Sequence, residues 1–75
     1  MLINFSAIKI KSMFYYLLKG NEVVVHKSSL KYYDVKVIYG QAVCGCFGRL
    51  DYAEAWKDYY NKTITLKELN LRLEN

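Results

Sequence analysis

The stretch Val35–Phe47 constrains the fold most, because a Gly-X pair divides it into two β-prone runs. Val35–Tyr39 and Ala42–Phe47 are rich in β-branched, aromatic and cysteine residues, and Gly40-Gln41 lies between them. A Gly-X pair between such runs is typical of a hairpin closed by a type II′ turn. The sequence therefore predicts a hairpin over residues 35–47.

The second run of this hairpin carries small side chains on one face. Ala42, Cys44 and Cys46 alternate along it, and alternate residues of a strand point to the same face. Small side chains allow a second layer to approach closely. We therefore expect the amphipathic segment that follows in the chain to pack as a helix on this face.

An earlier hairpin is predicted from the alternation of side chains that begins at Ile8. Gly20-Asn21 supplies a second Gly-X turn, after which Glu22–Lys27 returns along the first strand. A two-residue turn would place Tyr15 opposite His26, with apolar residues facing apolar ones along the pair. Such cross-strand pairs stabilise antiparallel sheets.

Two capping patterns near the end of the chain predict helices. Asp51 is followed three residues later by Glu54, and Thr65 by Glu68, the spacing at which a cap side chain and an acid satisfy free amide groups. The first helix would carry an apolar stripe made of Tyr52, Ala55, Trp56, Tyr59 and Tyr60. For residues 69–75 the alternation of leucines leaves a terminal strand as an alternative to the second helix.

These elements predict one α+β domain over residues 1–75. Ser28–Leu30 would connect the first hairpin to a third strand, Lys31–Tyr39, so the expected fold is an antiparallel meander of about four strands backed by one or two C-terminal helices. A chain of 75 residues buries a limited core. Its content of 53% hydrophobic and 16% aromatic residues is high for such a short chain. Two interpretations stay open: the excess of apolar surface indicates a partner or self-association, or the chain simply has a dense aromatic core.

The excess of positive over negative charge is confined to the first half of the chain. Residues 1–40 hold six lysines against Glu22 and Asp34, whereas residues 41–75 hold five basic and five acidic side chains. Two interpretations stay open. The lysines would attract an anionic partner, or they would protect exposed strand edges against aggregation.

Candidate groups for metal binding and catalysis are few. Cys44 and Cys46 on one strand make a poor disulfide, and with His26, the only histidine, they complete a zinc site only if a carboxylate joins them. We expect buried free thiols, no metal, no cofactor and no enzyme activity, because a catalytic thiol needs partial exposure. The sequence has no secretory signal and no span of transmembrane length, so we expect a cytoplasmic protein.

The tyrosines indicate a binding function. A helix can cover only one face of the predicted sheet, so the other face would keep exposed aromatic rings, and tyrosine is enriched at interfaces. The expected contact residues are Tyr15, Lys19, Lys27, Lys31, Tyr33 and Lys36. We expect a non-enzymatic module that docks this face on a larger protein, or on a second copy as a homodimer. The alternative is a nucleic-acid-binding protein that uses the same tyrosines and lysines.

The general type of the chain favours one mechanism for such docking. A small chain without motifs, rich in residues with A/T-rich codons, is typical of phage-borne inhibitors of host proteins. For a protein of that type we expect inhibition by occlusion, in which a rigid aromatic and basic face covers a site on the host protein.

Overall fold

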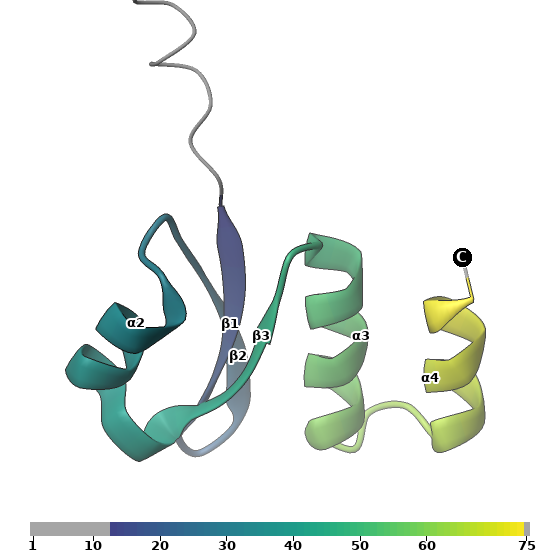
Figure 1. The fold of residues 1–75 in the computed structure, drawn as a ribbon. Coiled ribbons are helices and arrows are strands. Elements are labelled where there is room, and N and C mark those ends of the chain that lie inside the picture. The colour runs from purple at the N-terminus through teal and green to yellow at the C-terminus, as the bar shows by residue number, and fades with distance from the viewer. Residues whose placement is uncertain (1–12, 75) are drawn as a thin grey trace, which may run out of the picture.

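A computed structural model describes residues 13–74 as a small α+β domain with a three-stranded antiparallel sheet (Figure 1). The elements in chain order are β1 (Phe14–Lys19), β2 (Val23–Ser28), α2 (Tyr32–Tyr39), the 3₁₀ turn η1 (Gly40–Ala42), β3 (Val43–Phe47), α3 (Leu50–Tyr60) and α4 (Leu66–Leu73). The α+β class and the antiparallel sheet are confirmed. The residues before position 13, which include the start of the predicted alternation at Ile8, lie outside the described part.

The sheet has the strand order β2-β1-β3 and is covered on both faces (Figure 1). Helix α2 lies over one face and α3 over the other, and α4 packs on the outer side of α3. Two clusters of buried side chains hold these layers together. The cluster under α2 contains Tyr16, Val35 and Val43, and the cluster under α3 contains Leu17, Val23 and Ala53.

The first hairpin is confirmed, but its register differs from the prediction by one residue. Tyr15 lies opposite Lys27, and Tyr16 lies opposite His26. The reason is the turn, which contains three residues instead of two and is closed by a hydrogen bond of 3.0 Å from the Gly20 N–H to the Glu22 carbonyl. A shift of one residue moves each side chain to a different cross-strand neighbour.

The prediction of a third strand over Lys31–Tyr39 is wrong, because this segment forms α2. Its β-prone residues gain more from covering the sheet than from extending it, since Val35 becomes fully buried between Tyr16 and Val43. Tertiary packing overrides a β propensity of this size. The helix ends at Gly40, whose φ of +59° suits glycine and whose N–H donates to the Lys36 carbonyl.

The hairpin predicted over residues 35–47 is therefore wrong, although its second strand exists as β3. This strand pairs with β1, with Tyr15 opposite Phe47 and Leu17 opposite Gly45. Gly40, expected in the turn of a hairpin, instead ends a helix that leads through η1 into β3. The sheet consequently has three strands, and the predicted four-stranded meander is not formed by the described residues.

Both C-terminal helices are confirmed, but only one of the two predicted caps is. The Thr65 hydroxyl accepts a hydrogen bond of 3.2 Å from the Glu68 N–H at the start of α4. Helix α3 begins one residue before Asp51, and its N-cap residue Arg49 makes no side-chain cap bond. Asp51 instead accepts two hydrogen bonds from the Arg49 guanidinium, at 3.0 and 2.6 Å. The alternative of a C-terminal strand is excluded for residues 66–73.

Helix α3 approaches the sheet where the side chains are smallest, but on the face opposite to the expected one. Ala53 is fully buried against Leu17, and Gly45 lies beside the same leucine on β3. A Cβ atom on Gly45 would lie 3.3 Å from the Leu17 Cδ1 atom and 3.2 Å from a ring carbon of Phe47. The close approach therefore depends on Ala53 and Gly45, and not on the predicted row of Ala42, Cys44 and Cys46.

Asn61, at the C-terminal end of α3, joins this helix to the edge strand β2. Its Oδ1 atom accepts a hydrogen bond of 2.7 Å from the Val23 N–H, and its Nδ2 atom donates one of 2.8 Å to the Val23 carbonyl. The side chain thus pairs with the edge of β2 as another strand would. None of the helices between residues 13 and 74 has the length and apolar character needed to cross a membrane.

Candidate functional site

The outer face of α2 is the most exposed apolar surface among the described residues. Tyr33 is 76% exposed and Val37 is 67% exposed. The two lie four residues apart and therefore form one ridge, on the side of the helix opposite the buried Val35. We call Tyr33 and Val37 the outer ridge of α2. Nearer the sheet, on the two sides of Val35, the helix also exposes part of three large side chains, namely Tyr32, Ile38 and Tyr39.

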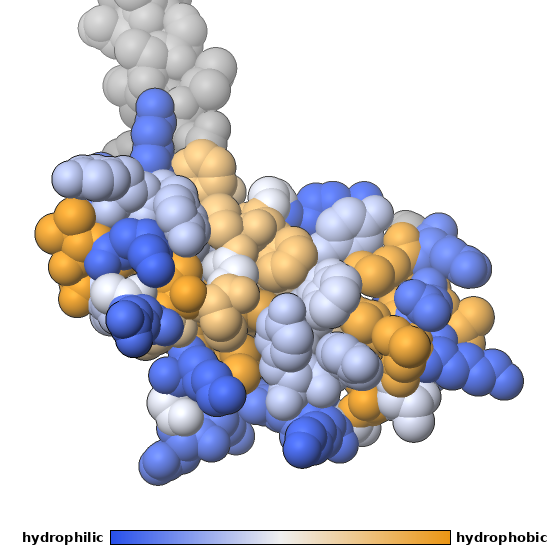
Figure 2. Space-filling view, turned by 60° about the horizontal axis from the view of Figure 1, so that its bottom comes forward, coloured by the Kyte–Doolittle hydropathy of each residue, from blue (hydrophilic) through white to orange (hydrophobic). Residues whose placement is uncertain are grey.

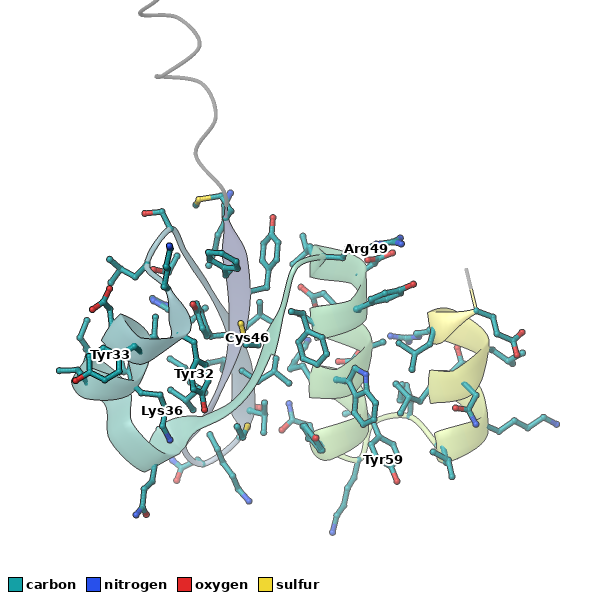
Figure 3. All side chains as sticks on the ribbon, in the orientation of Figure 1. Tyr32, Tyr33, Lys36, Cys46, Arg49 and Tyr59 are labelled. Carbon is teal, nitrogen blue, oxygen red and sulfur yellow. The ribbon has the colours of Figure 1, made fainter. Side chains whose placement is uncertain are left out.

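This arrangement places apolar side chains on both the inner and the outer side of α2. Figure 2 shows hydrophobic side chains at the left of the molecule, over α2, interspersed with hydrophilic ones. In Figure 3 Tyr33 projects from the side of the helix that faces away from the sheet, whereas Tyr32 projects toward β3. Large apolar side chains that are exposed next to each other are unusual on a small soluble domain. The outer ridge is therefore the main candidate for a functional surface among the described residues.

Two charged residues border the outer ridge. Asp34 and Lys36 alternate with the apolar residues of α2, and neither takes part in an ion pair within residues 13–74. At 100° per residue they lie about 80° to opposite sides of the ridge. The surface therefore has an apolar centre, with one negative edge and one positive edge.

The structure divides the six predicted contact residues between the two sides of the sheet. Tyr15 and Lys27 are cross-strand partners on the face covered by α3, where Tyr15 packs against the Leu17 cluster. Tyr33 and Lys36 lie on α2, and Lys31 is its N-cap residue. Lys19 ends β1. The premise that one face of the sheet stays uncovered is wrong, because α2 covers it.

The charged side chains also fall into two groups. All the ion pairs within residues 13–74 involve α3, α4 or the residue before α3, such as Arg72 with Asp58 at 2.8 Å. The nearby Lys57 and Arg72 lower the pKa of the Asp58 carboxyl. The lysines that make no ion pair among the described residues form the other group. Four of them, at positions 19, 27, 31 and 36, belong to the sheet or to α2 and its N-cap, and two, at positions 62 and 67, follow α3 and lie on α4. Unpaired positive charge is therefore present at both ends of the molecule, with more of it on the side of the sheet and α2.

The cysteines do not form the buried pair that the sequence predicts. Both thiols are free and exposed. Cys46 lies opposite Tyr16 on the α2 side, whereas Cys44 occupies an irregular step in the pairing of β3 with β1 and borders a small hollow lined also by Lys19, Val23 and Tyr60. Burial raises the pKa of Tyr16, and the nearby Cys46 raises it further.

The candidate metal ligands are dispersed. His26 makes an edge-on contact with the ring of Tyr39 at 5.2 Å between centroids. Within residues 13–74 no three side chains of histidine, cysteine, aspartate or glutamate gather as metal ligands would. The two cysteines and His26, which would need a carboxylate to complete a zinc site, are not gathered into one by the described residues.

An open cleft of about 830 Å³ lies at the start of α3. The two arginines of the chain, Arg49 and Arg72, both line it, together with Asp51 and Glu54. Arg49 is held by Asp51 and lies 4.4 Å above the ring centre of Tyr52. Hydrogen bonding to Arg49 lowers the pKa of Asp51. The cleft is therefore electrically balanced by its own side chains, which weakens it as a site for a charged ligand.

Sequence reasoning missed Val37, because the strand predicted over Lys31–Tyr39 would have made it an ordinary sheet residue. The spacing of Tyr33 and Val37, followed by Gly40, also fits a short helix with a glycine at its C-terminus. That reading would have placed both residues on one ridge. No family model, no curated protein and no solved structure matches this chain.

Proposed function

We propose that this protein is a non-enzymatic protein-binding module that docks on a larger protein through the outer ridge of α2. One observation carries the proposal: Tyr33 and Val37 are about three-quarters and two-thirds exposed on a helix whose opposite side is fully buried. Exposed apolar surface of this kind marks interaction sites on soluble proteins. The function would be exerted by occupying a site on the partner, as an occluding inhibitor does.

The position of α2 in the fold supports this role. The helix is the outermost layer on its side of the sheet, so the ridge is accessible to a large partner (Figure 1). Val35 fixes the helix on the sheet, and the Tyr16 hydroxyl donates a hydrogen bond of 2.6 Å to the Leu30 carbonyl just before it. A helix held in this way presents i and i+4 anchors to a groove without having to fold on binding.

The described lysines favour a protein partner over a nucleic acid. Binding of a single strand requires a continuous basic groove with stacking platforms. Lys27 lies on the α3 side of the sheet, whereas Lys31 and Lys36 belong to the α2 side. The exposed ring of Tyr33 adjoins Val37, and an apolar valine side chain has no positive charge or hydrogen-bond donor for a phosphate group.

The test is a comparison of captured partners. The tagged protein is incubated with an extract of the cells in which it naturally occurs and is then cross-linked. The double variant Tyr33→Ser/Val37→Ser and the control Leu66→Ser are treated in parallel. Leu66 is similarly exposed on α4, at the other end of the molecule. A partner that binds the wild type and the control but not the double variant is the expected result. Partners that bind all three forms equally, or none of them, would contradict the proposal.

A second measurement separates the nucleic-acid alternative. The protein is titrated with single-stranded oligonucleotides at low and raised salt. The docking proposal predicts no tight binding, whereas micromolar binding with a steep salt dependence would favour the alternative.

A further inference from the structure

We infer that a second copy of this chain covers the outer ridge of α2 in the free protein, with the two α2 helices parallel about a twofold axis. The inference rests on the proposed function in one respect: it takes the same ridge to be the contact surface. It adds the identity of one occupant and the orientation in which that occupant binds.

The outer ridge is apolar along its length. Tyr33 and Val37, at positions i and i+4, present an aromatic and an aliphatic side chain, and this pair packs well against its own copy across a twofold axis. The domain is small, and such domains commonly gain stability by oligomerisation. Among the described residues, no part of the chain lies over this side of α2 (Figure 1).

The two edges of the ridge carry opposite charges. Asp34 lies on one side and Lys36 on the other, about 80° from the centre of the ridge. When two such helices face each other in parallel, the twofold axis runs along the helices and brings the Asp34 edge of one copy to the Lys36 edge of the other. Two ion pairs form, one on each side of the apolar contact.

The antiparallel arrangement has the opposite result. A twofold axis perpendicular to the helices brings each edge to its own copy, so that Asp34 faces Asp34 and Lys36 faces Lys36. Like charges at this distance destabilise a contact. The charge pattern of α2 therefore selects the parallel dimer. Because the contact uses one short helix, we expect weak association, which a larger partner of the same ridge would displace.

The first experiment measures the oligomeric state. Sedimentation equilibrium of the full chain over about 10 μM to 1 mM, the range in which small interfaces associate, is expected to show a monomer–dimer equilibrium. Tyr33→Ser/Val37→Ser should abolish the dimer, and Leu66→Ser should leave it unchanged. Circular dichroism of each form establishes that the fold is kept. A wild-type protein that stays monomeric over the whole range would overturn the inference.

The second experiment tests the orientation by exchanging charges. Asp34→Lys alone, or Lys36→Asp alone, places like charges opposite each other in a parallel dimer and should weaken the dimer roughly tenfold, as expected for two exposed pairs. The double variant Asp34→Lys/Lys36→Asp should restore wild-type association. In an antiparallel dimer neither single variant would have this effect, so unchanged association of the single variants would refute the parallel geometry.

The outcomes also separate this inference from the proposed function. A strictly monomeric protein that still captures a partner through Tyr33 and Val37 overturns the dimer and leaves the docking function standing. A dimer that is insensitive to the ridge variants places self-association elsewhere and overturns the inference as well. A monomer without any ridge-dependent partner removes both.

Discussion

Replacement of Asn61 by alanine should cost more stability than any other single change to a polar side chain within the described residues. Asn61 makes two hydrogen bonds to one residue, Val23, at 2.7 and 2.8 Å. Val23 is only 4% exposed, so its N–H and carbonyl would gain little water in return. Each lost bond costs about 1 kcal/mol, and more where the partner is left buried.

The expected loss is therefore about 2–3 kcal/mol, out of a total stability of roughly 4–11 kcal/mol for a chain of this length. Urea unfolding followed by the fluorescence of Trp56, the single tryptophan, measures it directly. This indole lies 6.5 Å from the ring of Phe47 on β3, so it reports separation of α3 from the sheet. Thermal unfolding should move down by roughly 10–20 °C.

Two further variants test the physical cause. Asn70→Ala removes an exposed asparagine from α4 and should be neutral or slightly stabilising, because alanine favours helix. Asn61→Asp keeps the acceptor for the Val23 N–H but turns a carboxylate oxygen toward the Val23 carbonyl. Because that contact brings two acceptors together, the variant should also be less stable than the wild type at neutral pH. A loss below about 0.5 kcal/mol for Asn61→Ala would refute the reasoning.

Four other outcomes follow from the fold. Tyr16→Phe should cost about 1 kcal/mol and speed hydrogen exchange in α2, since it removes the 2.6 Å hydrogen bond to the Leu30 carbonyl; unchanged exchange would contradict this role. Gly40→Ala should cost about 1 kcal/mol because of the φ of +59°, whereas Gly20→Ala, with open space around it, should cost less in the same urea assay. Thr65→Ala should lower stability by about 1 kcal/mol through loss of the α4 cap, and equal midpoints would argue against it. Lys57 and Arg72 lower the pKa of Asp58, so the ionised Asp58 stabilises the fold fully above the ordinary carboxyl pKa, and this contribution is lost as pH falls through the lowered pKa of the folded state. Asp58→Asn should therefore flatten this part of the curve of stability against pH by at most about 1 kcal/mol.

The elements that could be predicted from sequence are those fixed by local signals. The first hairpin follows from alternation around Gly20, and α4 follows from the Thr65 cap. The register of the hairpin could not be predicted, because turns of two and three residues fit the same Gly-Asn-Glu sequence. The two registers differ in whether Leu17 or Tyr16 lies opposite Val25. The packing of Leu17 against α3 selects the observed register.

The segment Lys31–Tyr39 could not be assigned from its own residues. Valine, isoleucine and tyrosine before a glycine suit a strand that enters a turn, and they also suit a short helix that ends at that glycine. The conformation of this segment depends on a strand that comes later in the chain. Because β3 pairs with β1, the segment is not needed as a strand, and Val35 packs over Tyr16 instead. The residues of the candidate site depend on whether this segment is a strand or a helix. Tyr33 is at the surface in either case, but Val37 joins it only on a helix.

The attachment of α2 through one buried residue has a consequence for the protein at raised temperature. A single fully buried residue, Val35, holds the helix on the sheet. If the helix detaches, it releases the run Val-Lys-Val-Ile-Tyr, a β-prone segment without proline or glycine. This segment would lie next to β3, an edge strand of the sheet that residues 13–74 form. Segments of this kind stack into cross-β fibrils. Mild heating should therefore lead to fibrils that start at this segment before the rest of the domain unfolds.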